Sequence, residues 1–488
     1  MSFAPMSPFA TAREQLAALQ ARRISATELL ELQLARIRHI NPEINAVTDV
    51  ALEDARQAAS AAQAALEQGD ERAMLGLPMT VKDVIEVKGL RATAGVPQFA
   101  EHRSERDAPA AARLRAAGAV LFGKTNVPPY CGDWQADNEV FGRTVNPWDV
   151  ALTPGGSSGG SAAALATGMT PLGMGSDIGG SIRIPAAFCG VYGHKTSEGI
   201  VPYAGHFPDN VLPNPANRIA VIGPLARSAA DLKLAMQQLT GPGSAEQRAW
   251  RLTLPPARAT RLADLRVALM PRLDWLPLDD EIQSAIDNLA RMLRDRGATV
   301  GEAFPAELDD MYGYYLDYQR VEWGIVSVDI DNAERSRQAA LLRVMQDSVA
   351  DAVAEGMQAN SVEYVSWHLR RARYQRVFAD FFQDWDLLLA PCAISNAFPH
   401  SEVWWAERTV QVNGSPASFL NFSAYAGIAT FAGLPSTAFP AGRTRDGLPI
   451  GLQAIDPYLE DETCLTFAEL AEVELGGFTP PPAFAVGS

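Results

Sequence analysis

The chain alternates between segments with apolar residues at helical spacing and short apolar runs that are typical of buried strands. Helical spacing occurs over residues 25–39, 51–68, 108–117, 229–239, 280–296 and 460–474, and 306–384 is mostly helical and rich in Tyr and Trp. Short apolar runs occur over 75–85, 119–122, 172–175, 265–270, 298–302, 386–390, 437–440 and 450–454. This alternation predicts an α/β protein with a mixed, mostly parallel, twisted β-sheet and helices on both of its faces.

Local signals indicate where several of these helices begin and end. Ser25 and Glu28 have the spacing of a capping box, and Ser228 and Asp231 have the same spacing before a second helix. We expect the first of these helices to end near Asn41 and Pro42, because the residue before a proline disfavours helical backbone angles.

The stretch 153–189 differs from the rest of the chain in composition. It contains two serine clusters wrapped in glycine, GGSSGG at 155–160 and GGS at 179–181. Asp177 and Arg183 are the only charged residues between Val150 and Gly193, and we expect them to form a buried pair. Glycine permits unusual backbone turns and close approach to its N–H, so this stretch indicates a buried site and not a surface linker.

Two interpretations of this stretch compete. Residues 156–160 fit the G-x-S-x-G pattern of α/β-hydrolases, with Ser158 as nucleophile and a histidine such as His400 as its base. That pattern requires a strand before the serine, whereas Pro154 and two glycines precede it. The second interpretation uses both clusters together, with Ser157 and Ser181 held close by two glycine loops.

The two clusters together resemble the amidase signature family, through the block GGSSGGS followed by DIGGSIRIP. Further matching pieces are LGLPMTVKDVI, LFGKTNV, IGPLARSAADL, AGLPSTAFPAG and GLPIGLQAI, so the resemblance covers most of the chain. It implies one amidase signature domain over 1–488, with its catalytic core at about 70–230. The region at about 306–420 matches poorly, and we expect it to be a variable, mostly helical part that shapes the substrate pocket.

The resemblance also implies roles for individual residues. Ser181 would be the nucleophile and Lys82 the general base. Ser157, on a cis peptide bond after Gly156, would pass the proton between them. The oxyanion hole would consist of the backbone N–H groups of Ile178, Gly179, Gly180 and Ser181. No cofactor and no metal is implied.

The setting of Lys82 is consistent with a base. A lysine acts as a base only when its pKa falls well below the ordinary value, and burial has that effect. Lys82 stands in an apolar run, in a chain with only five lysines. The alternative is an ion pair with Asp83, but neighbouring residues of a strand point to opposite faces.

Other residues near these clusters receive supporting roles. Ser158, Asp177 and Arg183 are expected to support the serine loops. Tyr130, Cys131, Gly132 and Trp134 are candidate walls of the substrate pocket. His194 and His206 are candidate triad bases, although a histidine without a catalytic role is the commoner case.

Composition limits the partners. The formal net charge of −16 argues against nucleic acid and against anionic membrane. The four cysteines are scattered and form no C-x-x-C pattern, which favours reduced thiols. The first residues also lack a signal-peptide pattern, and both observations favour a cytoplasmic location. We expect a monomer or homodimer that acts on a small molecule.

The predicted function is an amidohydrolase that cleaves an amide through an acyl-enzyme, with esters and carbamates as further substrates of the same chemistry. The aromatic residues and the negative charge favour neutral, aryl or hydrophobic amides. Two alternatives stay open: an α/β-hydrolase-like esterase that uses Ser158 and a histidine, and a glutaminase-type subunit of an amidotransferase.

Overall fold

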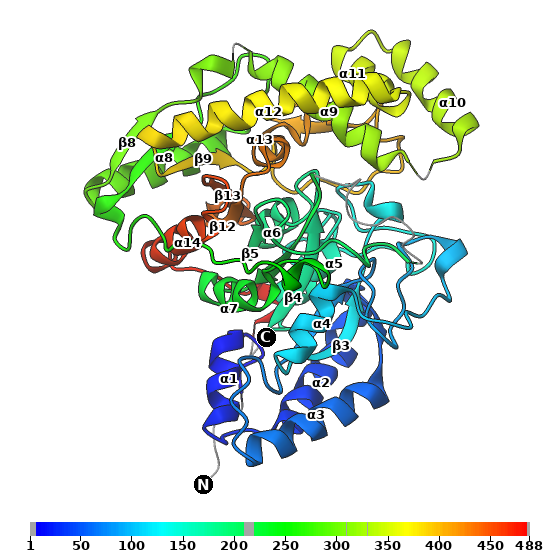
Figure 1. Ribbon diagram of the computed structural model, residues 1–488, viewed down its shortest axis with the longest axis vertical. Coiled ribbons are helices and arrows are strands. Elements are labelled where there is room, and N and C mark those ends of the chain that lie inside the picture. Colours follow the sequence, from blue (N-terminus) through cyan, green and yellow to red (C-terminus); the bar gives the residue numbers. More distant parts are fainter. Residues whose placement is uncertain (1–5, 209–218, 309, 329, 486–488) are drawn as a thin grey trace.

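The computed structural model contains one long mixed sheet with helices packed on both of its sides (Figure 1). The structure describes residues 6–208, 219–308, 310–328 and 330–485. In spatial order the sheet consists of β1 (Val47–Val50), β3 (Val120–Thr125), β2 (Pro78–Lys82), β4 (Leu172–Asp177), β6 (Val221–Ala226), β5 (Tyr192–Lys195), β12 (Ser436–Arg443), β13 (Pro449–Ile455), β9 (Leu387–Pro391), β7 (Arg266–Leu269) and β8 (Thr299–Glu302).

The sheet is mixed, as expected, and its parallel pairings fall in two blocks. Strand β2 pairs in parallel with β3 and β4, and β7 pairs in parallel with β8 and β9. Every pairing from β4 through β6, β5, β12 and β13 to β9 is antiparallel, and so is the edge pairing of β1 with β3. The antiparallel section is more extensive than the alternation of strands and helices predicts, because an apolar run predicts a strand but not the direction of its neighbour.

The helices that surround the sheet follow the predicted alternation. They are α1 (Ala12–Gln20), α2 (Ala26–Ile44), α3 (Leu52–Glu67), α4 (Pro109–Ala116), α5 (Gly159–Ala166), α6 (Arg183–Cys189), α7 (Ala229–Leu239), α8 (Asp280–Asp295), α9 (Met311–Val326), α10 (Asn332–Arg343), α11 (Ser348–Met357), α12 (Ser361–Asp384), α13 (Ala424–Ala432) and α14 (Asp461–Leu475). Helices α9 to α12 form a layer at one end of the molecule, and α1 to α3 lie at the opposite end (Figure 1). A small hairpin of β10 (Thr409–Val412) and β11 (Ser415–Ser418) follows β9.

The capping signals are confirmed, whereas one predicted helix end is wrong. The Ser25 and Glu28 side chains form the reciprocal capping box, and the Ser228 hydroxyl accepts the N–H of Asp231. Helix α2 continues past Pro42 to Ile44 and ends at Asn45 in the left-handed conformation. The Asn41 side chain accepts the N–H groups of Ala46 and Val47, which holds the chain just after this last turn.

The strands at the centre of the sheet are buried on both faces. All residues of β2, β3, β4 and β6 are buried, because helices cover the sheet on each side. Polar residues on these strands therefore lie in the interior. Lys82 at the end of β2 and Asp177 at the end of β4 are two of them.

Candidate active site

Two parallel strands bring the predicted site residues to one edge of the sheet. Lys82 is the last residue of β2, and its neighbour β4 ends at Asp177. The register pairs Val81 with Met174, so Lys82 lies beside the carboxyl end of β4. Parallel strands end at the same edge of a sheet, and the glycine loops before α5 and after β4 meet there. The Ser158 N–H donates to the Ser181 carbonyl at 3.0 Å and ties the two loops together.

The amine of Lys82 lies among serine oxygens in the interior. Lys82 is 0% exposed, and its Nζ lies 2.7 Å from Ser157 Oγ and 3.0 Å from Ser176 Oγ. The Ser176 carbonyl lies 3.3 Å away. Burial lowers the pKa of Lys82 from the ordinary lysine value, and Cys131 and Asp177 offset part of this shift. Asp83 does not pair with Lys82, since its Oδ2 accepts the Thr93 hydroxyl at 2.7 Å and the Thr93 N–H at 2.8 Å.

The Ser157 loop packs too closely for a side chain at the preceding residue. The Gly156–Ser157 peptide bond is cis, as the family resemblance implies. A Cβ at Gly156 would lie 2.4 Å from the Asp133 carbonyl oxygen and 2.7 Å from the Gln135 nitrogen. Ser157 is 1% exposed and Ser181 is 6% exposed, so Ser181 is the more accessible of the two.

Most backbone N–H groups of the loop from 178 to 181 have no acceptor among the residues that the structure describes. Among the hydrogen bonds of the described residues, none uses the N–H of Ile178, Gly179 or Ser181. Gly180 differs from the expectation, because its N–H donates to Asp177 Oδ1 at 2.9 Å. Three of the four predicted oxyanion donors are therefore available, and the fourth helps to hold the loop.

Two aromatic side chains fix the direction of these N–H groups. Trp134 Nε1 donates to the Gly179 carbonyl at 2.9 Å, and the Tyr318 hydroxyl donates to the Ile178 carbonyl at 3.0 Å. The C=O and N–H of a trans peptide point in opposite directions. Holding the Ile178 carbonyl therefore turns the Gly179 N–H toward the other side of the loop.

Asp177 and Arg183 form the predicted buried pair, and Arg183 uses all five of its donors. Its Nε and one terminal nitrogen lie 3.1 and 2.9 Å from the two carboxylate oxygens. The remaining N–H groups bind Thr430 Oγ1, the Ala426 carbonyl and Gln453 Oε1 at 2.7–2.9 Å. Burial raises the pKa of Asp177, but the Arg183 charge and hydrogen bonds outweigh it and bring that pKa to about 2.

The predicted pocket residues separate into two groups. The Cys131 thiol interacts with Ser157 and Lys82, and Trp134 packs on Phe419 and Phe422 at ring distances of 5.1 and 5.2 Å. Cys131 and Trp134 thus contact the serine cluster or its loop. Tyr130, by contrast, is 43% exposed, and the Gly132 N–H donates to the carbonyl of Pro129 within the same turn.

The Ser158 and histidine interpretation lacks its structural requirements. No strand precedes Ser158, which directly precedes α5, and its hydroxyl donates to the Ser176 carbonyl at 3.3 Å. Burial lowers the pKa of His400 to about 4, and the residues that shift it further are Arg143, Asp137, Thr144 and Asp133, and not Ser158. His194 binds Thr437 Oγ1 and Asp461 Oδ1 at 2.9 and 3.1 Å.

Four residues at the site were missed or underestimated from the sequence. Ser176 contacts Lys82, and His206 Nε2 lies 2.7 Å from Ser176 Oγ. Tyr318 and Glu322, one turn apart on α9, reach the loop at 178–179. Burial raises the pKa of Glu322 to about 8, and interactions with Tyr318 and Gln319 reduce the shift only in part. For Tyr318 and Glu322, the sequence offered one local signal, a glutamate among aromatic residues on a helix.

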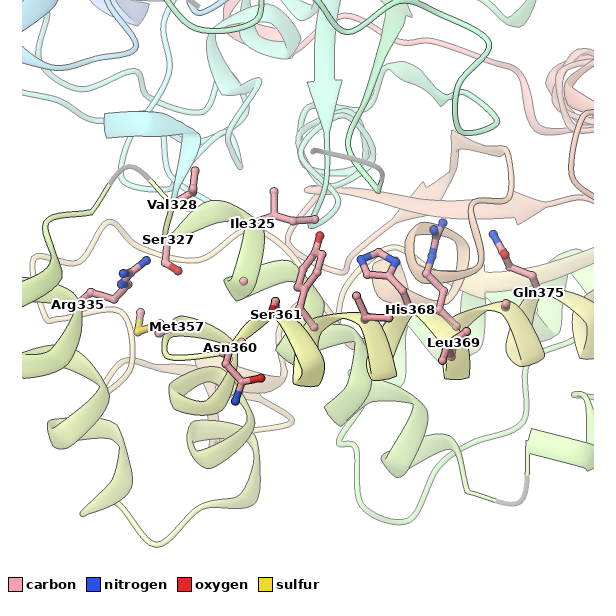
Figure 2. A pocket seen from close by; sticks show the side chains of 17 residues that line it. Ile325, Ser327, Val328, Arg335, Met357, Asn360, Ser361, His368, Leu369 and Gln375 are labelled. Atoms are coloured by element: carbon pink, nitrogen blue, oxygen red, sulfur yellow. The ribbon is translucent and has the colours of Figure 1, made fainter. Parts of the chain in front are cut away.

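A separate cavity of about 650 Å³ opens among α9 to α12 (Figure 2). Its labelled walls include Ile325 from α9 and Ser361, His368 and Gln375 from α12. On α9, Ile325 follows Tyr318 by seven residues and Glu322 by three, so these three side chains lie on the same side of that helix. Lys82, Ser157 and Ser181 are not among its lining residues, so it is distinct from the serine cluster.

Neither a metal cluster nor a membrane span is found in the described part of the chain. Within those ranges, no group of three or more His, Cys, Asp or Glu side chains could hold a metal ion. None of the helices that the structure describes has the length and apolar character needed to cross a membrane.

Comparisons with known proteins agree with this fold and with the serine motifs. The family model described as amidase matches residues 28–465. A glutamyl-tRNA(Gln) amidotransferase subunit from Roseiflexus sp. (strain RS-1) is 32% identical over 478 residues, which are 93% of each chain. The chain belongs to the amidase family, and it is an enzyme of the hydrolase type that acts on C–N amide bonds.

Solved structures of amidase signature enzymes superpose over nearly the full length. A 6-aminohexanoate cyclic dimer hydrolase complexed with substrate gives a TM-score of 0.80 at 25% identity, covering 98% of this chain and 100% of that one. A bacterial aryl acylamidase of the amidase signature family gives 0.79 at 26% identity, covering 96% and 97%. Relatives of this fold thus act on different amides.

Proposed function

We propose that this protein hydrolyses a carboxylic amide through an acyl-enzyme on Ser181, with Ser157 as proton relay and Lys82 as general base. The observation that carries the proposal is the 2.7 Å separation of Lys82 Nζ and Ser157 Oγ in the interior. A buried lysine with a lowered pKa can be neutral and accept a proton.

The proposed first step forms the acyl-enzyme. Ser181 Oγ attacks the carbonyl carbon, its proton moves to Ser157 Oγ, and the Ser157 proton moves to Lys82 Nζ. The negative charge on the substrate oxygen is stabilised by N–H groups of the 178–181 loop, and one such donor is worth on the order of 3 kcal/mol. As the C–N bond breaks, the proton returns through Ser157 to the leaving nitrogen.

The second step restores the enzyme. Water loses a proton through the same relay and attacks the acyl carbon, and the carboxylic acid leaves as Ser181 regains its proton. Esters and carbamates can undergo the same acyl transfer, so we include them as substrates. A panel of aryl amides, fatty amides, amino-acid amides and aryl carbamates would identify the preferred acyl and leaving groups.

Labelling with a serine-reactive fluorophosphonate, followed by peptide mapping, tests the nucleophile. The adduct is expected on Ser181, and Ser181→Ala should abolish it. Ser158→Ala is the matched control and should still be labelled. An adduct on Ser158 would instead support a nucleophile at the start of α5 and overturn the assignment.

The base is tested by Lys82→Met, for which we expect a loss of kcat/KM of roughly 10²- to 10⁴-fold, the range for a positioned base. Lys195→Met is the matched control, because Lys195 is also fully buried but donates to the Leu434 and Thr196 carbonyls. A Lys82→Met enzyme with near-normal turnover would defeat the proposal.

A second function is favoured by the curated relatives. The 32% identical Roseiflexus protein is named as part of an amidotransferase, which suggests a glutaminase-type subunit that delivers ammonia within a complex. This alternative predicts hydrolysis of glutamine and little activity without a partner chain. Turnover of the purified chain on aryl or fatty amides, with none on glutamine, would exclude it.

A further inference from the structure

A line of hydrogen bonds continues from Lys82 away from the serine nucleophile. Ser176 Oγ lies 3.0 Å from Lys82 Nζ and 2.7 Å from His206 Nε2. His206 is 2% exposed, and its ring stacks on Tyr203 at 4.4 Å and meets Phe207 edge-on at 4.7 Å. The mechanism proposed for Ser181 assigns no role to His206.

The donor count around Lys82 limits how these bonds can be arranged. A neutral amine has two N–H donors and one lone pair, whereas three oxygens lie around Nζ and the Cys131 thiol is a further, weak partner. The Ser176 carbonyl can only accept, so it takes one N–H. The two hydroxyls are stronger partners than the thiol, so one accepts the second N–H and the other donates to the lone pair.

Only one of the two arrangements suits a base. If Lys82 is to remove the Ser157 proton, its lone pair has to face Ser157. Ser176 Oγ must then accept from Lys82, and its own hydroxyl proton needs another acceptor. His206 Nε2 is placed to be that acceptor when the ring proton is on Nδ1.

We propose that His206 is a positioning residue that acts through Ser176 to aim the lone pair of Lys82 at Ser157. The inference rests on the proposed role of Lys82 as base. A protonated His206 would donate to Ser176 Oγ and release the Ser176 proton toward Lys82. The lone pair would then point to Ser176, and Ser157 would receive an N–H in place of giving up its proton.

Burial, together with the positive charges near the ring, favours the required neutral form of His206. Burial lowers the pKa of His206 well below that of an ordinary histidine, and Lys82 and Lys124 lower it further. Lys82 in turn is affected by Cys131 and Asp177, both of which oppose the lowering of its pKa.

The test compares His206→Phe, Ser176→Ala and the double variant. Phenylalanine keeps the stack on Tyr203 but removes the acceptor. We expect His206→Phe to lower kcat by roughly 5- to 100-fold, within the range of coupling in hydrogen-bonded networks, with little change in KM. The double variant should lose no more than the single variants, because both remove the same link.

The pH profile of kcat/KM distinguishes a positioning role of His206 from a folding defect in the variants. Without the acceptor, the Ser176 hydroxyl proton loses its partner when protonated Lys82 donates to all three oxygens, whereas neutral Lys82 can still accept that proton on its lone pair. The acidic limb of kcat/KM should therefore move to lower pH in His206→Phe. His206→Gln, whose carbonyl oxygen can accept, should recover part of kcat, and Tyr203→Phe should leave the limb in place.

Additive losses in the double variant, or an unmoved acidic limb in His206→Phe, would overturn the inference. Failure of the underlying mechanism is distinguishable, because it would appear as turnover in Lys82→Met. An inactive Lys82→Met enzyme together with a normal His206→Phe enzyme would remove only the role of His206.

Discussion

Arg183 and Asp177 are joined by a two-point ion pair from which solvent is excluded, and the same carboxylate holds the loop that carries Ser181. Both side chains are 0% exposed. The two carboxylate oxygens also accept the N–H groups of Gly180 and Ile182 at 2.9 and 3.0 Å. The pair thus links the end of β4, the start of α6 and, through Arg183, helix α13.

Replacing Arg183 by lysine should destabilise the protein strongly. A lysine cannot provide five donors in a planar fork, and breaking a buried pair costs roughly 3–5 kcal/mol. Arg266→Lys is the control, because Arg266 makes a similar two-point contact with Asp386 but is 43% exposed, and exposed pairs contribute about 1 kcal/mol or less. Urea unfolding measures the free energy of unfolding of both variants, and equal losses in the two would contradict this explanation.

Lowering the pH should remove the contribution of Asp177 to the free energy of unfolding within a defined pH range. Its pKa is about 2 in the folded protein and about 3.8 in the unfolded chain. A depressed carboxyl pKa adds stability that is complete above the unfolded pKa and is lost as the pH falls through the folded one. The unfolding free energy should therefore fall between about pH 4 and pH 2, and less steeply in Asp177→Asn. Parallel slopes for the two proteins would count against the predicted role.

Alanine at Gly180 should damage the nucleophile loop more than alanine at a similar turn elsewhere. Gly180 has φ +93°, and a Cβ there would lie 2.7 Å from Ile184 Cδ1 and 2.9 Å from Ala426 Cβ. Gly199 has φ +84° but nothing within 4 Å of the added atom, so Gly199→Ala reports backbone strain alone. We expect Gly180→Ala to lose stability and turnover beyond the control, measured by thermal unfolding and by kcat. Equal effects of the two substitutions would show that crowding at Gly180 is unimportant.

Glu322 should limit activity at alkaline pH. Burial raises its pKa to about 8, so the side chain is neutral below that pH and negative above it. Its Oε1 lies 2.7 Å from where a Cβ of Gly179 would be, beside the loop proposed to stabilise an oxyanion. A negative charge there opposes the transition state, and kcat/KM should decline above about pH 8. Glu322→Gln should lose this decline, and an unchanged alkaline limb in that variant would refute the explanation.

Much of the fold was predictable because it follows from local patterns. Capping boxes, apolar runs and helical spacing located most strands and helices to within a few residues, including β7, α8 and β8. Strand direction was less predictable, since hydrogen bonding across the middle of the sheet joins strands that are distant in the sequence. The helix end expected near Pro42 was wrong, because the Asn41 side chain supports one more turn.

The glycine clusters alone favoured a close approach of Ser157 and Ser181, because such clusters are local features. The link of Lys82 to these serines came from the family resemblance, and its apolar setting only agreed with it. Which N–H groups stay available depends on the packed structure, since the Asp177 carboxylate takes that of Gly180. The same packing brings His206 to Ser176, and Tyr318 to Ile178 across 140 residues. Such contacts arise where separate elements pack together, and no short-range pattern of residues encodes them.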